Sequence, residues 1–207
     1  MELAELVDPS HTAIVTQEVQ KGVVGPESTL PMLAEAARAS GALDNMGRLC
    51  DAGRAVGVEV IHGIARHRAD MKGSNSNARL FRATARRKSG QFEGTDMVEV
   101  ADELHPDAAD FVSSRYHGIG PIAGTDVDAL LRNLGVTTVV MIGVSSNVAI
   151  PNGVFDLVNL AYEVVVPRDA IAGFPAEYTD TIVDNSLSLV ATITTTDELV
   201  AAWSATR

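Results

Sequence analysis

Short apolar runs alternate with longer amphipathic stretches along this chain. The clearest runs are rich in β-branched residues and cover residues 13–15, 58–61, 138–142 and 164–166. Helical patterns lie between them, for example over residues 126–134 and 148–161. Apolar strands separated by helices are typical of parallel sheets that are covered on both faces. With shorter runs at 110–112 and 190–193, the pattern predicts an α/β fold. We expect three layers: a doubly wound parallel sheet of about six strands with helices on both faces.

Turn and cap signals agree with this order of elements. Gly57 precedes the second strand, and Gly135 lies between a predicted helix and the strand at 138–142. The sequence from Thr194 to Glu198 predicts an N-terminal cap for a last helix at 197–203. No repeat or linker is visible, so we expect a single domain over residues 1–207. Its one irregular region, about residues 67–106, is expected to be a long loop or lid.

Charge and composition narrow the possible partners. A formal net charge of -11 argues against nucleic acid, and no apolar run approaches the ~20 residues of a membrane span. The acidic N-terminus does not look like a secretory signal, and the only cysteine, Cys50, leaves no intrachain disulfide. We therefore expect a cytoplasmic protein whose partner is a small-molecule substrate. The basic stretch 79–88 is either a solvated face or a lid that contacts an anion or another subunit.

Candidate chemistry follows the carboxyl ends of the strands, where open parallel sheets bind ligands. The polar residues that follow the predicted strands there are Glu18, His62, Arg115, Tyr116, His117, residues 145–149 and Asp169. Glu18 is a candidate general acid or base, or alternatively an anchor for a neighbouring loop. The turn at 143–150 directs backbone N–H groups toward one point, as an oxyanion site would, or is an ordinary strand-to-helix turn.

We predict catalytic and substrate-binding residues from these positions. Arg115 offers a fork of donors suited to a carboxylate, and His117 can transfer a proton near neutral pH. The alternative is that these side chains only pack their loop. The predicted catalytic residues are Glu18, Arg115 and His117, and the predicted substrate-binding residues are Tyr116, Ser145, Ser146, Asn147, Val148 and Ala149.

Four segments, in order, resemble the isochorismatase-like (cysteine hydrolase) superfamily. Residues 12–20 are similar to its opening strand, which ends in Asp-x-Gln, and 143–150 to its Gly-Val-x-Thr-Asn-Val-Cys-Val elbow. Residues 124–131 resemble its Gly-Thr-x-Leu helix start, and 162–170 its Tyr-x-Val-x-Val segment. The resemblance implies a hydrolase whose Asp, Lys and Cys positions correspond here to Glu18, to Arg115 or His117, and to Ala149.

These departures leave several functions open. Alanine cannot attack a substrate, so the resemblance implies a hydrolase without a cysteine nucleophile, in which Glu18 acts on substrate or water at an amide, C–N or vinyl-ether bond. The alternative is a catalytically inactive relative that binds a small molecule or serves in an assembly. A weaker possibility is a nucleophile from Cys50 or a neighbouring subunit. The resemblance also implies a homodimer or homotetramer and a cis peptide near Val144 and Ser145.

A metal site is the remaining alternative. His62, His67 and Asp70 are close in sequence, but their spacing does not suit one helical face. We therefore expect no metal and no cofactor.

Overall fold

The computed structural model describes residues 2–86 and 90–205, and they form a three-layer α/β structure. All strand pairs are parallel, and the strand order is β3-β2-β1-β4-β5-β7, with β6 added beside β4. The strands are β1 (Thr12–Gln17), β2 (Glu59–Ala65), β3 (Phe111–Arg115), β4 (Thr138–Val144), β5 (Glu163–Pro167), β6 (Ile171–Ala172) and β7 (Thr192–Thr194). The predicted fold class is confirmed, with seven strands where we expected about six.

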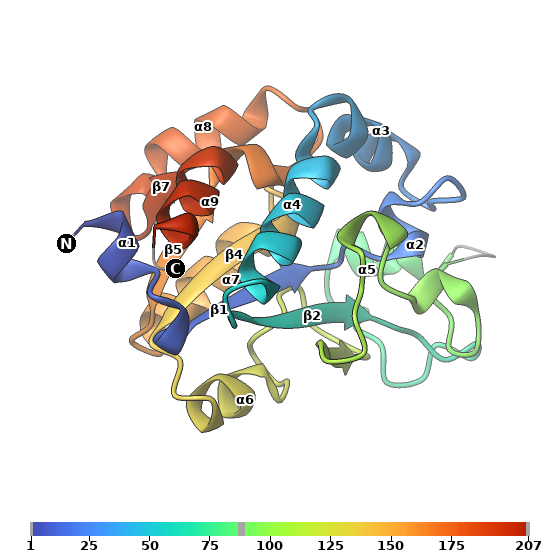
Figure 1. Ribbon diagram of the computed structural model, residues 1–207. Coiled ribbons are helices and arrows are strands. Elements are labelled where there is room, and N and C mark those ends of the chain that lie inside the picture. Colours follow the sequence, from blue (N-terminus) through green and yellow to red (C-terminus); the bar gives the residue numbers. More distant parts are fainter. Residues whose placement is uncertain (1, 87–89, 206–207) are drawn as a thin grey trace.

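Helices cover both faces of the sheet (Figure 1). Side chains of successive strand residues point to opposite faces, so Ile14 packs into one core cluster while Ala13 and Val15 pack into the other. The first face carries α1 (Leu3–Leu6), α2 (Lys21–Val24), α3 (Pro31–Ala39), α4 (Ala42–Arg54) and α9 (Thr196–Ser204). The second carries α6 (Val127–Asn133), α7 (Ala149–Asn159) and α8 (Tyr178–Asn185).

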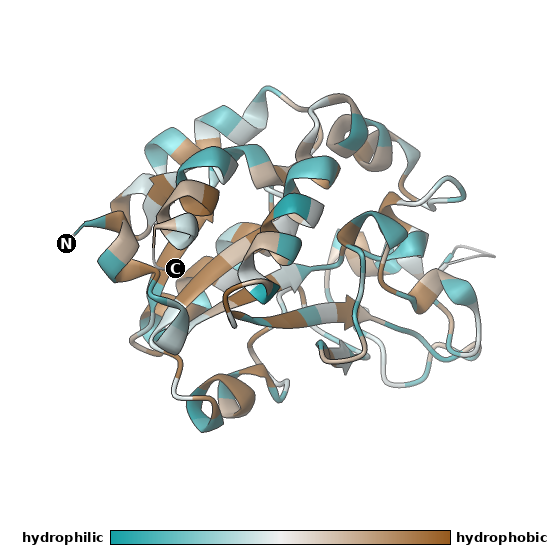
Figure 2. Ribbon diagram, in the orientation of Figure 1, coloured by the Kyte–Doolittle hydropathy of each residue, from teal (hydrophilic) through white to brown (hydrophobic). Residues whose placement is uncertain are grey.

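Apolar residues concentrate in the strands and on the inner faces of these helices (Figure 2). The central strands β1 and β4 are buried along their whole length, which explains their continuous apolar runs. No helix in the described ranges is long and apolar enough to cross a membrane.

The region expected to be irregular, 67–106, contains some regular structure. It includes the short helix α5 (Arg79–Thr84) and 3-10 turns at Asp96–Val98 and Asp102–Leu104. Helix α5 has no buried residue, so it lies on the surface of the molecule. Of the basic stretch 79–88, Arg87 and Lys88 lie outside the described residues.

Strand β2 corrects the sequence interpretation. We expected His62 to follow a strand that ends at residue 61, but β2 continues to Ala65. His62 therefore lies inside the sheet, paired in register with Thr16 on β1 and Val112 on β3. The apolar run stops at Ile61, whereas the backbone pairing continues because the polar side chain of His62 has partners in the core.

Candidate active site

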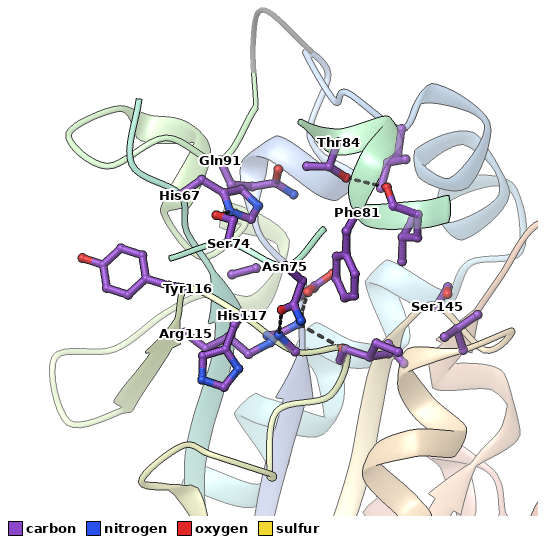
Figure 3. Close-up of a pocket in the computed structure, with 18 of the residues that line it drawn as sticks. His67, Ser74, Asn75, Phe81, Thr84, Gln91, Arg115, Tyr116, His117 and Ser145 are labelled. Atoms are coloured by element: carbon purple, nitrogen blue, oxygen red, sulfur yellow. Dashed lines mark hydrogen bonds and ion pairs between the residues drawn. The ribbon is translucent and has the colours of Figure 1, made fainter. Parts of the chain in front are cut away.

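A cavity of about 170 Å³ lies at the carboxyl edge of the sheet. Glu18 and Ala149, which follow β1 and the turn after β4, both line it, so two segments distant in sequence meet there as the fold class requires. Figure 3 shows the polar part of the lining, which includes His67, Ser74, Asn75, Gln91 and Arg115. The apolar part includes Leu30, Leu33, Met71, Leu80, Phe81 and Val148.

Glu18 follows β1 in an unusual backbone conformation. Its φ is +50°, a region that residues other than glycine seldom adopt, and its N–H donates to Gly63 O on β2 at 2.8 Å. Non-glycine residues in this region concentrate at functional sites. This conformation turns the chain at the strand end and places the carboxylate on the cavity.

Arg115 forms an ion pair with Glu18. Its Nη2 donates to Glu18 Oε1 and also to Ile119 O, the latter at 3.0 Å. The Arg115 side chain is only 4% exposed and that of Glu18 is 21% exposed. We expected Arg115 or His117 to orient an anionic or polar substrate. In the structure Arg115 Nη2 is engaged with Glu18, whereas Nε and Nη1 are buried and have no hydrogen-bond partner among the described residues. In this ion pair Glu18 is the acceptor of a charge-assisted hydrogen bond.

The turn after β4 leads into helix α7 and contains the cis peptide that the family resemblance implied. The cis peptide lies at Val144-Ser145, and Ser145 O accepts the N–H of Ile150 at 3.0 Å. Gly143 has a φ of +121°, and a Cβ there would lie 2.4 Å from Gln17 O, so only glycine allows β4 to approach β1 this closely. Helix α7 then begins at Ala149.

The first N–H of α7 is available to a ligand. Ala149 N–H has no acceptor within residues 2–86 and 90–205, and Ala149 lines the cavity. The amino end of a helix carries partial positive charge, so this position can stabilise negative charge that develops on an oxygen.

Ser146 and Asn147, predicted to bind substrate, point elsewhere. Ser146 Oγ bonds Thr179 Oγ1 at 2.8 Å, and the Asn147 carboxamide exchanges two hydrogen bonds with the backbone of Phe174, at 2.9 and 3.0 Å. Neither residue lines the cavity, whereas Ser145, Val148 and Ala149 do. Ser146 and Asn147 instead fix the elbow to residues 172–179, because their side chains bond that segment.

Tyr116 and His117 direct their rings away from the cavity, although both residues border it. The Tyr116 ring lies under the Arg66 guanidinium, 4.8 Å from ring centroid to Cζ, and its hydroxyl donates to Glu93. His117 is exposed, and its Cε1 lies 3.0 Å from the position that a Cβ on Gly124 would take. Of the two candidates for the lysine position of the family, it is thus Arg115 that contacts Glu18.

The three residues weighed as a metal site do not converge. His62 is buried between Thr16 Oγ1 and Asp110 Oδ2, at 3.0 and 3.1 Å, and Asp70 pairs with Arg68. His67 Nδ1 contacts Ser74 Oγ at 3.0 Å. No group of three potential metal ligands occurs within the described ranges.

Two other sequence candidates are also remote from the cavity. Asp169 accepts the N–H and hydroxyl of Thr196, at 2.8 and 3.0 Å, and so holds the start of α9. Cys50 is fully buried in α4, and burial raises the pKa of its thiol to about 12. A buried neutral thiol outside the cavity is a packing group and does not suit nucleophilic attack.

The region 67–106 contributes residues that sequence reasoning missed. His67 was considered only as a metal ligand, yet it lines the cavity, and burial lowers the pKa of its imidazole so that the ring is neutral at pH 7. Asn75 Oδ1 accepts the N–H of Gly118 at 2.6 Å, and Gln91 lines the cavity beside them. No periodicity marks these residues, so the sequence carried no signal for their convergence.

Comparisons with known proteins agree with the fold. The sequence model of the isochorismatase domain matches residues 12–198, from β1 into α9. The chain belongs to the isochorismatase family. This family membership confirms the resemblance read from the four sequence segments.

Relatives of this isochorismatase-family chain include characterised amidohydrolases. The ureidoacrylate amidohydrolase RutB of Rhizobium rhizogenes is 28% identical over 176 residues, which cover 78% of this chain and 70% of RutB. A cysteine hydrolase from Pseudomonas syringae pv. phaseolicola superposes with a TM-score of 0.81 at 23% identity, covering 98% of this chain and 96% of that one. N-carbamoylsarcosine amidase from Thermoplasma acidophilum gives 0.71 at 21% identity, covering 90% and 97%. The two structural matches establish the common fold.

Proposed function

We propose that this isochorismatase-family protein hydrolyses an amide-type C–N bond of a small molecule without a cysteine nucleophile, using Glu18 as general base on water. The observation that carries the proposal is the Glu18 carboxylate, paired with Arg115, on the same cavity as the first N–H of α7. The amidohydrolase activity of RutB supports the choice of bond.

The proposed reaction needs no group beyond these residues and water. Glu18 accepts a proton from water while the oxygen attacks the carbonyl carbon, and the Ala149 N–H stabilises the resulting oxyanion. The tetrahedral intermediate then expels the amine, which takes the proton from Glu18, and a carboxylic acid remains. Because Glu18 accepts a hydrogen bond from Arg115 in the ion pair, base chemistry on an amide is better supported than protonation of a vinyl ether, which needs an acid.

Substitution of Glu18 tests this function. Turnover is measured on a panel of small amides and ureido compounds, and Glu18→Gln should lower kcat/KM by about 10²–10⁴-fold, the usual contribution of a general base. Glu163→Gln is the matched control, because Glu163 is exposed at the start of β5. Equal turnover of Glu18→Gln and wild type would exclude the mechanism.

A binding protein without activity is the second candidate. The absence of a thiol at Ala149 and the engagement of Arg115 by Glu18 favour it. A small molecule that co-purifies with the protein, together with no Glu18-dependent turnover on the panel, would establish this alternative. Any hydrolysis that Glu18→Gln abolishes would eliminate it.

A further inference from the structure

Gln91 is a buried residue whose side-chain carboxamide has no hydrogen-bond partner in the part of the chain that the structure describes. It is 6% exposed, yet its carboxamide makes no hydrogen bond to any residue in the described ranges. Gln20 shows the usual arrangement: its Oε1 accepts Ala65 N–H at 2.8 Å and its Nε2 donates to Ala65 O at 2.9 Å. Buried carboxamides are nearly always satisfied by protein or water, so the partner of the Gln91 carboxamide is water or a ligand that enters the cavity.

The Gln91 side chain is held in position for such a partner. The backbone carbonyl of Gln91 accepts His67 N–H at 2.7 Å, and Glu93 N–H donates to His67 O at 2.9 Å, so the backbone is fixed on both sides. Its Cγ packs over Gly22, where a Cβ would come within 3.1 Å. Figure 3 shows the carboxamide extending between His67 and Thr84. Such preorganisation lowers the entropy lost on binding.

The charges around the cavity favour a neutral ligand. Glu18 and Arg115 are the charged side chains among the described lining residues, and they neutralise each other. A charged ligand would therefore lose its hydration without gaining a free counter-charge. The apolar lining, with Leu33, Phe81 and Val148, suits the hydrocarbon part of such a ligand.

A carboxamide offers one acceptor and two donors in a plane. Its complement is an edge with an N–H beside a C=O, as in a primary amide, a lactam or a ureido group. A carboxylate has acceptors only and would leave Gln91 Oε1 facing a lone pair.

We propose that Gln91 is a specificity-determining residue that recognises the amide or ureido edge of a neutral ligand through paired hydrogen bonds. The inference deepens the proposed function, because it names the substrate class of the same cavity. It concerns binding, so it does not depend on turnover.

Binding of benzamide, benzoate and acetophenone, measured by isothermal titration calorimetry, tests the inference. Benzamide carries the full donor–acceptor edge, acetophenone lacks the donor, and benzoate has only acceptors. Wild type should bind benzamide at least about tenfold more tightly than either of the others, because losing a hydrogen bond to a buried polar group costs this much. Gln91→Met should abolish that preference, and Gln91→Glu should reduce it.

Two controls separate the possible outcomes. Gln91→Met should leave Tm close to that of wild type because no bond within the protein is lost, whereas Gln20→Met should lower Tm and keep the preference for benzamide. The inference would be overturned if wild type showed no preference for benzamide, or if Gln91→Met and Gln91→Glu both retained that preference. A Gln91-dependent preference with no turnover on the amide panel would leave the inference standing and remove the hydrolase proposal.

Discussion

At the scale of single residues, the distribution of buried charge decides which groups are available for chemistry. Arg115 and Glu18 form an ion pair beside the cavity through Arg115 Nη2, whereas Arg115 Nε and Nη1 are buried without a hydrogen-bond partner among the described residues. A second network lies deeper in the sheet. There Asp110 accepts two hydrogen bonds from Arg54, at 3.0 and 2.7 Å, and contacts His62, which contacts Thr16 in turn. This second network does not reach the cavity lining, so we assign it to stability.

The His62 network predicts a pH dependence of stability. Burial lowers the pKa of His62 below 6.5, although the hydrogen bond with Asp110 opposes the shift. The unfolded chain therefore binds this proton at a higher pH than the folded protein, and the stabilisation present above pH 6.5 is lost as the pH falls toward the folded pKa. The free energy of unfolding, from urea denaturation at pH 7, 6 and 5, should fall with pH, and it should fall less steeply in His62→Leu. An identical slope in both proteins would show that His62 does not contribute.

Asp110 predicts a second loss of stability, at lower pH. Burial raises the pKa of this carboxyl, but hydrogen bonds from Arg54, Asp107 N–H and His62 outweigh burial, and the pKa is lowered below 3.8. Stability from this group is present above pH 3.8 and is lost at lower pH. The loss from Asp110 begins below pH 3.8, whereas the loss from His62 begins below pH 6.5.

At the scale of elements, helix α9 shows how a local signal in the sequence fixes a boundary. Thr195 Oγ1 accepts Glu198 N–H at 3.3 Å, and Glu198 Oε2 accepts Thr195 N–H at 2.9 Å, which is a capping box. Thr195→Ala should lower the free energy of unfolding by about 1 kcal/mol, measured by chemical denaturation. Ser204→Ala, at the other end of the same helix, serves as the control. A loss at Thr195→Ala no larger than that at Ser204→Ala would contradict a stabilising cap.

Elements with local signals could be predicted from the sequence, and those that depend on distant partners could not. Helix α9 was expected over 197–203 and spans Thr196–Ser204, because its cap lies within four residues of sequence. Strand β6 has two residues and no apolar run of its own, so it exists only through its pairing with β4. The positions of Gln91 and His117 beside the cavity depend on distant segments, such as the backbone bond between His67 and Gln91, which sequence periodicity does not encode.

At the scale of the whole molecule, the parallel order of the sheet assembles the site. The carboxyl ends of β1, β2, β3 and β4 face one edge, so Glu18, Arg115 and the elbow before α7 meet there without local sequence contacts. The fold class and the meeting of Glu18 with Ala149 could therefore be predicted from the alternation of strands and helices and the family resemblance, because parallel strands end at one edge of the sheet. The cover formed by residues 67–86 and 90–92, which supplies His67, Phe81 and Gln91, has no periodic signal in the sequence and had to be seen in the structure.

The central claim is that water, activated by Glu18, attacks the substrate directly. It is tested by a single turnover with enzyme in excess, in water labelled with heavy oxygen, on an amide that the panel shows to be hydrolysed. We predict heavy oxygen in the carboxylic acid released in this first turnover, and none in Glu18. Unlabelled acid in the first turnover would mean that an oxygen of the protein attacked instead, and this result, or a panel without any Glu18-dependent hydrolysis, would contradict the claim.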